Sequence, residues 1–299
     1  PTRKGELTLK VNKFWIAVFV LPAVLLFSSV YAVSLVILIT TSFTNFTAGG
    51  GGNFIGLSNY IQLLKPGSEF LQVIKNNIVW VLLQTTLHIC LGVVIAFILA
   101  RNKWYKDVVR TIYMLPNIIP NAALGMLFLF ILNPKFGMVN SAIRFITGNK
   151  SFMQNWFMEP KTAFGALTIT WLPYAGITVI LVMSEMTSVS RSLYEAAIID
   201  GASEFQTNIY IILPLMRNII GTATILAASN MLQKLDIILL TTSGGPGVRT
   251  TNMPMSIYRT ALIENNYGLA NAQGIILILL GLLSVIIIRR LYRMNENNF

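Results

Sequence analysis

The segment Tyr194-Glu-Ala-Ala-Ile-Ile-Asp-Gly-Ala202, followed by Leu213-Pro214, organises this chain, because it is polar and lies between two long apolar segments. A short helix is expected to begin at Ser190, a favourable N-cap, and to continue through the alanines, which are good helix formers. Gly201 permits the left-handed turn that ends such a helix. A second short helix is expected from about Ser203, leading to a proline that is tolerated in the first turn of the next helix.

The charge of this segment differs in sign from that of the whole chain. Between residues 186 and 216 one basic residue, Arg191, stands against three acidic residues, Glu195, Asp200 and Glu204. The segment therefore has a net charge of −2 in a chain whose net charge is +11. Anionic lipid attracts basic surfaces, so this segment suits a protein partner better than a lipid surface.

The composition predicts a polytopic membrane protein. Of the 299 residues, 55% are hydrophobic and only 11% are charged, and the mean hydropathy is +0.67. The single cysteine, Cys90, lies in an apolar run, so the sequence gives no disulfide framework and no metal site. A nucleic-acid partner is not expected, because no basic run contains interleaved aromatic residues.

Six charge-poor segments are each long enough to cross a bilayer about 30 Å thick. We expect one all-α membrane domain over residues 1–299. The fifth span contains Arg217, whose long side chain can extend to the membrane surface. The expected spans are residues 14–40, 78–100, 111–132, 162–184, 209–233 and 271–288.

The distribution of Lys and Arg predicts the orientation of the chain. The segments on the N-terminal side of the membrane hold 13 Lys and Arg residues, and the longer segments on the opposite side hold 9. Because cytoplasmic loops are enriched in Lys and Arg, both termini are expected in the cytoplasm. This orientation also places the 190–214 segment in the cytoplasm.

The 190–214 segment resembles the signature loop of the permease subunits of bacterial ABC importers. Glu195-Ala-Ala197, Gly201, Ile211 and Leu213-Pro214 occupy the positions of that signature. The resemblance implies a coupling helix that docks on a cytoplasmic ATPase. The residues to which it assigns this role are Tyr194, Glu195, Ala196, Ala197, Asp200, Gly201, Ala202, Leu213 and Pro214.

Four further motifs are similar to the carbohydrate branch of these permeases, of the maltose and glycerol-3-phosphate types, and to the first of its two permease subunits. They are residues 114–120 (MLPNIIP), 133–140 (NPKFGMVN), 170–174 (TWLPY) and 240–246 (LTTSGGP). Compared with the enterobacterial maltose subunit, the chain lacks the large extracellular insertion and the additional N-terminal spans. The resemblance implies a type I ABC importer in a bacterial plasma membrane.

The same resemblance implies several partners. A second homologous permease would complete the path through the bilayer, two ATPase subunits would bind ATP and Mg²⁺, and an extracellular solute-binding protein would deliver a sugar. This chain has no Gly-x-x-x-x-Gly-Lys-Ser/Thr motif, so we expect no bound cofactor and an energy source in another chain. No paired carboxylates or nucleophile–base pair indicates an enzyme.

The expected substrate path contains neutral polar and aromatic groups, which suit the hydroxyls and C–H faces of a sugar. Trp171, Tyr174, Asn230 and Gln233 are groups of this kind, although Trp171 could instead be a packing aromatic and Asn230 a helix–helix hydrogen bond. The resemblance assigns the path to Trp171, Leu172, Tyr174, Gly176, Asn230 and Gln233.

Charged groups in the middle of the spans would indicate ion coupling or an anionic solute. The sequence shows none there except His88, so we expect a neutral carbohydrate and no proton or sodium coupling. Two alternatives remain: the same machinery for another solute, such as an amino acid or a polyol phosphate, and a membrane scaffold or sensor that does not transport.

Overall fold

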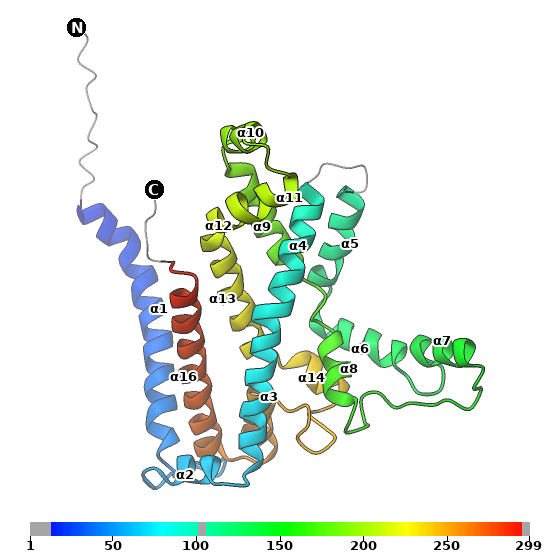
Figure 1. The fold of residues 1–299 in the computed structure, drawn as a ribbon. Helices are drawn as coiled ribbons and strands as arrows, with labels where there is room; N and C mark the ends of the chain where they lie inside the picture. The colour runs from blue at the N-terminus through cyan, green and yellow to red at the C-terminus, as the bar shows by residue number, and fades with distance from the viewer. Residues whose placement is uncertain (1–12, 101–105, 295–299) are drawn as a thin grey trace.

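The computed structural model describes residues 13–100 and 106–294, and all its regular elements there are helical. Figure 1 shows α1 and α16 side by side, α3 and α4 forming one long rod, and α13 beside that rod. The longer helices are α1 (Lys13–Ser42), α3 (Glu69–Leu83), α4 (Ile89–Ala100), α5 (Lys106–Ile118), α6 (Asn121–Ile131), α9 (Gly176–Ser188), α13 (Arg217–Gln233) and α16 (Tyr267–Leu291).

Shorter helices connect these elements. A π-helical turn at Gln84–His88 joins α3 to α4 without a break in direction. The other short helices are α2 (Ser58–Leu64), α7 (Met138–Thr147), α8 (Ala163–Ile169), α10 (Arg191–Ile199), α11 (Glu204–Thr207), α12 (Leu213–Leu215), α14 (Asp236–Thr241) and α15 (Met253–Tyr258), with π-helical turns at Asn208–Ile212 and Arg259–Ile263.

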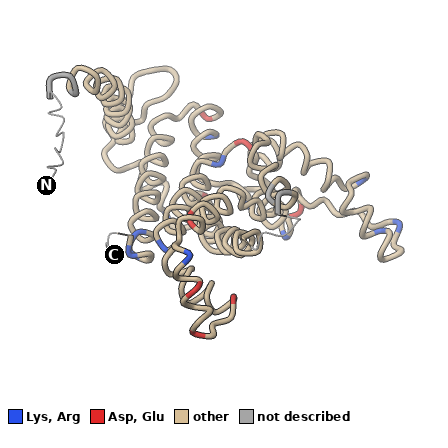
Figure 2. Tube along the Cα trace, turned by 90° about the horizontal axis from the view of Figure 1, so that it is seen from above, with Lys and Arg blue, Asp and Glu red and all other residues tan. Residues whose placement is uncertain are grey.

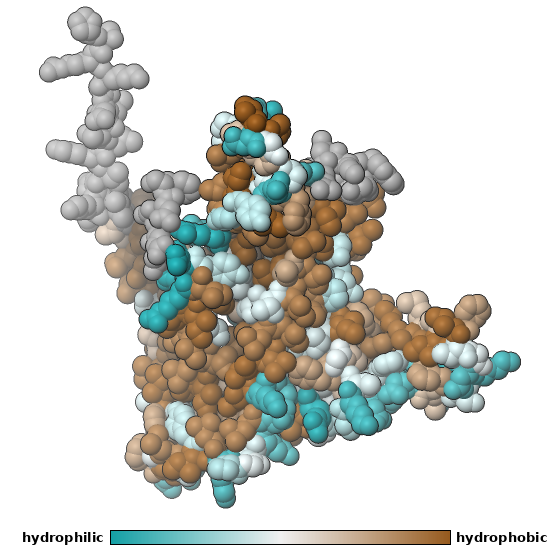
Figure 3. All heavy atoms as spheres, in the orientation of Figure 1, coloured by the Kyte–Doolittle hydropathy of each residue, from teal (hydrophilic) through white to brown (hydrophobic). Residues whose placement is uncertain are grey.

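Among the described residues, three helices are long and apolar enough to cross a membrane: Ala17–Ser42, Glu69–Ala100 and Tyr267–Leu291. They correspond to the first, second and sixth expected spans, although the second begins nine residues earlier than residue 78. Figure 3 shows a broad apolar surface over the body of the molecule, with hydrophilic residues gathered mainly toward its two ends. Such a surface suits a hydrocarbon environment.

Two expected spans are bent. The third is divided into Thr111–Ile118 and Asn121–Ile131, which meet at 108°, because Pro120 is extended and begins α6. The fifth is divided into Glu204–Leu215 and Arg217–Gln233, which meet at 69°. The expected span 209–233 therefore overlaps both parts of this bent pair, and α13 itself begins at Arg217.

The fourth expected span, residues 162–184, is not one helix. The first part is α8, the second part is α9, and residues 170–175 between them are not helical. Pro173 lies in this break and disfavours the helical conformation of Leu172 before it. The fourth expected span is thus two short helices, and within residues 13–100 and 106–294 up to five spans meet the length and hydropathy criterion if each bent pair counts once.

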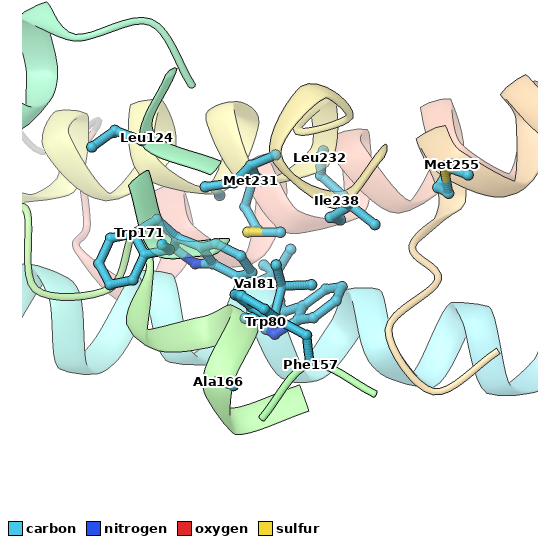
Figure 4. Close-up of a cluster of buried hydrophobic side chains, with 14 of the residues drawn as sticks. Trp80, Val81, Leu124, Phe157, Ala166, Trp171, Met231, Leu232, Ile238 and Met255 are labelled. Carbon is cyan, nitrogen blue, oxygen red and sulfur yellow. The ribbon is translucent and has the colours of Figure 1, made fainter. Parts of the chain in front are cut away.

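The central core is built around Trp80 of α3, whose side chain is fully buried. Its ring stacks on Phe164 at a centroid distance of 4.6 Å and meets the edge of Trp171 at 5.4 Å. Its indole Nε1 donates a 2.8 Å hydrogen bond to Thr168 Oγ1. Figure 4 shows Trp80, Trp171 and Met231 converging in this cluster. The cluster thus fixes α8 and the break after it against α3 and α13.

Candidate functional site

The end of α10 is a Schellman motif, which turns the chain sharply. Gly201 has φ +74, its N–H donates to the carbonyl of Ile198 at 3.0 Å, and the N–H of Ala202 donates to the carbonyl of Ala197 at 2.9 Å. These two bonds satisfy carbonyls that the helix end would leave free. At the other end, Ser190 Oγ accepts a hydrogen bond from the N–H of Ser192, so the predicted N-cap is confirmed.

The second helix of this segment begins with a capping box. Ser203 Oγ accepts from the N–H of Gln206 at 3.3 Å, and Gln206 Oε1 accepts from the N–H of Ser203 at 2.8 Å. Such a reciprocal pair satisfies two donors at a helix start. The predicted order of helix, glycine turn and helix is therefore confirmed as α10, Gly201 and α11.

The α10–α11 segment projects from one end of the molecule. Figure 1 places it at the same end as the start of α1 and the end of α16. Its outer surface is apolar and acidic: Ile199 and Phe205 are 85% and 68% exposed, and Glu195 and Asp200 are exposed beside them. Charged residues are sparse along the rest of the trace (Figure 2). An exposed surface of this kind fits a protein groove better than water.

The inner side of the same segment is anchored to the helices below it. Ala197 is buried, and Tyr194 packs against a cluster that includes Val182 and Ile212. Burial raises the pKa of the Tyr194 phenol further above its usual value, because it disfavours the charged phenolate. The inner side of α10 therefore packs, through Tyr194, against α9 and the helices that continue into α13.

A second candidate site is a polar cavity of about 460 Å³ between α5, α6, α9 and α13. His88 lies on its wall, where Nδ1 is 2.9 Å from the carbonyl oxygen of Leu172. Because a carbonyl can only accept, Nδ1 carries the proton. The lining residues are Gln84, His88, Pro116, Asn117, Ile118, Ile119, Pro120, Asn121, Leu124, Trp171, Tyr174, Ile177, Thr178, Ala223, Leu226, Ala227, Asn230 and Lys234.

Three of the six residues expected along the substrate path line this cavity: Trp171, Tyr174 and Asn230. The other three, Leu172, Gly176 and Gln233, are not among its lining residues. Leu172 packs against the central core, and Gln233 is exposed at the end of α13.

Gly176 instead allows two helices to approach each other. A Cβ at this position would lie 2.4 Å from Asn117 Nδ2 and 2.6 Å from the carbonyl oxygen of Tyr113, both in α5. The Asn117 side chain also donates to that carbonyl at 3.1 Å. Gly176 thus determines how closely α9 packs on the wall that holds Asn117.

The cavity holds a cation that the sequence interpretation placed elsewhere. Lys234 is only 8% exposed, and its Nζ lies 5.5 Å from the centroid of the Trp171 ring. The sequence interpretation assigned Lys234 to an outer loop because the expected fifth span ended at Gln233, whereas the structure places this cation on the wall of the cavity. The apolar run from residue 237 to 240, which forms α14, was the signal that the chain remains within the fold.

The outer turn after α14 is held by side chains. Thr251 Oγ1 donates to the carbonyl of Gly244 at 2.9 Å, and Arg259 donates to the carbonyl of Ser243 at the same distance. Asn76 Nδ2 of α3 donates to three carbonyls of this loop, those of Val248, Arg249 and Thr251. The turn at residues 244–246 is therefore part of an ordered loop that is bonded to α3.

The helical fold, the apolar exterior, the projecting helix pair and the partly open cavity with its mixed polar and apolar walls are those of a multi-pass membrane permease. Solved structures share this architecture. A bacterial alginate ABC transporter, in complex with an alginate pentasaccharide-bound periplasmic protein, matches with a TM-score of 0.81 and 21% sequence identity, over 95% of this chain and 96% of that chain. At this level of identity the similarity shows the fold alone.

Residues 88–296 match the family described as binding-protein-dependent transport system inner membrane component, and the chain belongs to that family. The multiple sugar-binding transport system permease protein MsmF of Streptococcus mutans is 32% identical over 257 residues, which are 83% of this chain and 85% of that protein. The sulfoquinovosyl glycerol transport system permease protein SmoG of Agrobacterium fabrum is 27% identical over 279 residues, with coverages of 92% and 89%.

The chain is thus an ABC importer permease of the carbohydrate-uptake type, a multi-pass component of the plasma membrane. It is a transport component and not an enzyme. ATP is handled by a partner subunit in this family.

Proposed function

We propose that this chain forms, together with a second homologous permease, the path by which a sugar or oligosaccharide is imported. Two ATPase subunits bind ATP and Mg²⁺ on the cytoplasmic side, and an extracellular solute-binding protein delivers the sugar. The chain acts as one domain with six membrane passages, several of them bent or broken, and both termini are cytoplasmic. It belongs to the first of the two permease branches.

The observation that carries this proposal is the α10–α11 segment. Its outer surface is exposed and acidic, whereas its inner side is anchored on the helices that lead to α13. When the ATPases close, they push on Glu195, Asp200 and the exposed apolar residues around them. The anchored inner side transmits this movement, through the segment that contains Leu213 and Pro214, to the helices around the cavity, which opens to alternate sides.

A sugar is supported by the cavity and by the relatives. Two aromatic rings, Trp171 and Tyr174, and the amide of Asn230 line the same space. Sugars bind to such combinations because rings cover their C–H faces and amides pair with their hydroxyls. Two relatives are named as transport permeases for multiple sugars and for sulfoquinovosyl glycerol. Leu172, Gly176 and Gln233 remain proposed path residues.

The proposal is tested by mass spectrometry of the proteins that co-purify with this chain from its native membrane, followed by reconstitution. We expect a second permease, a P-loop ATPase and a sugar-binding protein to be recovered, and proteoliposomes of that complex to accumulate sugar only with ATP. Recovery of the crosslinked chain alone, or the absence of ATP-dependent accumulation, would favour the scaffold or sensor alternative.

A further inference from the structure

The position of Lys234 is fixed by its backbone. Its N–H donates to the carbonyl of Met231 at 3.3 Å, and its carbonyl oxygen accepts a 2.5 Å hydrogen bond from Asn252 Nδ2, a fully buried side chain. Asn252 is fixed in turn as the N-cap of α15. A lysine at a helix end can usually turn its ammonium to water. Here the backbone is fixed by these two hydrogen bonds, and the side chain lies over the Trp171 ring and lines the cavity.

No acidic side chain among the described residues lines the cavity to neutralise the Lys234 ammonium. Among the described residues that line the cavity, the other titratable nitrogen base is His88. Asp236 is near enough to attract the ammonium, but it is exposed and is not a lining residue. A cation–π contact with Trp171 offsets only part of the cost of burying a charge. The cavity is therefore electropositive and lacks an anion.

One acceptor on the cavity wall also has no hydrogen-bond donor. Gln84 Oε1 is a buried acceptor without a hydrogen-bond partner among the described residues. A buried amide oxygen is satisfied by a hydroxyl, and a buried ammonium by an anionic oxygen. One molecule that carries both groups on a ring would satisfy both positions and would place its C–H face on the aromatic walls.

We propose that the solute is an acidic carbohydrate, whose anionic group binds the Lys234 ammonium while its hydroxyls bind Gln84 and Asn230. This inference rests on the proposed transport function and specifies its substrate class. The charge makes the site selective because a neutral sugar leaves the buried ammonium unpaired. A neutral sugar therefore loses affinity for the site in addition to lacking the ion pair.

The test uses the complete complex, with its binding protein, in proteoliposomes. The probes are short uronic-acid oligosaccharides and the neutral counterparts made from them by reduction of their carboxyl groups. We expect ATP-driven uptake of the acidic probes to exceed that of the neutral ones. Lys234→Met should lower acidic uptake by about tenfold or more, because it removes a charged hydrogen-bond partner. Lys234→Arg, which keeps the charge, should retain most of it.

The uptake of the neutral probes distinguishes a role of Lys234 in binding the solute from a purely structural role. If the lysine only holds Trp171, Lys234→Met lowers the uptake of both kinds of probe equally, and the inference fails. Preferential uptake of the neutral probes by the wild-type complex also overturns it. If neither probe is taken up, the solute that co-purifies with the binding protein decides by its mass: an anionic solute supports the inference and a neutral one refutes it. The absence of any ATP-driven sugar uptake would instead refute the proposed function.

Discussion

Replacing Gly201 by alanine is expected to impair the coupling of ATP hydrolysis to uptake without unfolding the permease. Gly201 has φ +74, and a Cβ there would meet no heavy atom within 4 Å, so the cost is purely conformational. A left-handed conformation costs an L-residue about 1–2 kcal/mol relative to glycine. This cost lowers the population of the α10–α11 elbow relative to opened alternatives by about 5- to 30-fold.

A matched control is available in the same chain. Gly148 ends α7 with φ +70, and a Cβ there would likewise meet nothing within 4 Å. Gly148→Ala therefore imposes the same strain at a helix end far from the α10–α11 segment (Figure 1). A third variant, Gly201→Asn, should recover part of the function, because asparagine tolerates the left-handed region better than alanine.

The assay is ATP-dependent sugar uptake per mole of inserted permease in proteoliposomes, measured together with ATP hydrolysis stimulated by the binding protein. We expect Gly201→Ala to lose several-fold in uptake per ATP, whereas Gly148→Ala behaves as the wild type. Equal effects of the two alanine variants would refute the reasoning, because they would show that the strain acts through general stability and not through the elbow.

Three further predictions concern single side chains. Glu195→Lys should leave the protein inserted but uncouple ATP hydrolysis from uptake, since it reverses a charge on the exposed surface of α10; Glu159→Lys, exposed at the other end, should be neutral in the same assay. Gly176→Ala should lower the free energy of unfolding in detergent by about 1–3 kcal/mol, because its Cβ would overlap α5. Gly165→Ala in α8, where a Cβ would meet open space, should leave that free energy unchanged. Thr168→Val should cost about 1–3 kcal/mol of unfolding free energy, because it leaves the indole N–H of buried Trp80 without its acceptor; an unchanged denaturation midpoint would contradict this.

Local chemistry made the α10–α11 segment predictable from the sequence. Ser190, Gly201 and Ser203 each have a specific role at a helix end, and these roles depend on neighbours within a few residues. The structure confirms all three. The roles proposed for the exposed residues remain predictions, because they depend on other chains.

The course of the spans was less predictable, since hydropathy measures the length of an apolar segment and not its direction. Pro120 and Pro173 were visible in the sequence, but whether a proline bends a helix or breaks it depends on packing around it. Here Trp80 and Phe164 hold α8 in place while the chain after it turns away. The position of Lys234 was missed for a related reason, because its place on the cavity wall depends on α14 packing beside α6, which hydropathy does not show.

The first helix is distinct from the rest of the fold. No part of its most apolar stretch is buried inside the chain, its packing partner is α16, and none of its described residues belongs to the three core clusters. The family match also begins after it, at residue 88. The core clusters of the described residues therefore form without α1, and the apolar surface of this helix is left to face lipid or another chain. Most positions of α1 thus need only to be apolar, whereas Thr41, which accepts a hydrogen bond from Asn271 of α16, has a specific partner in the fold.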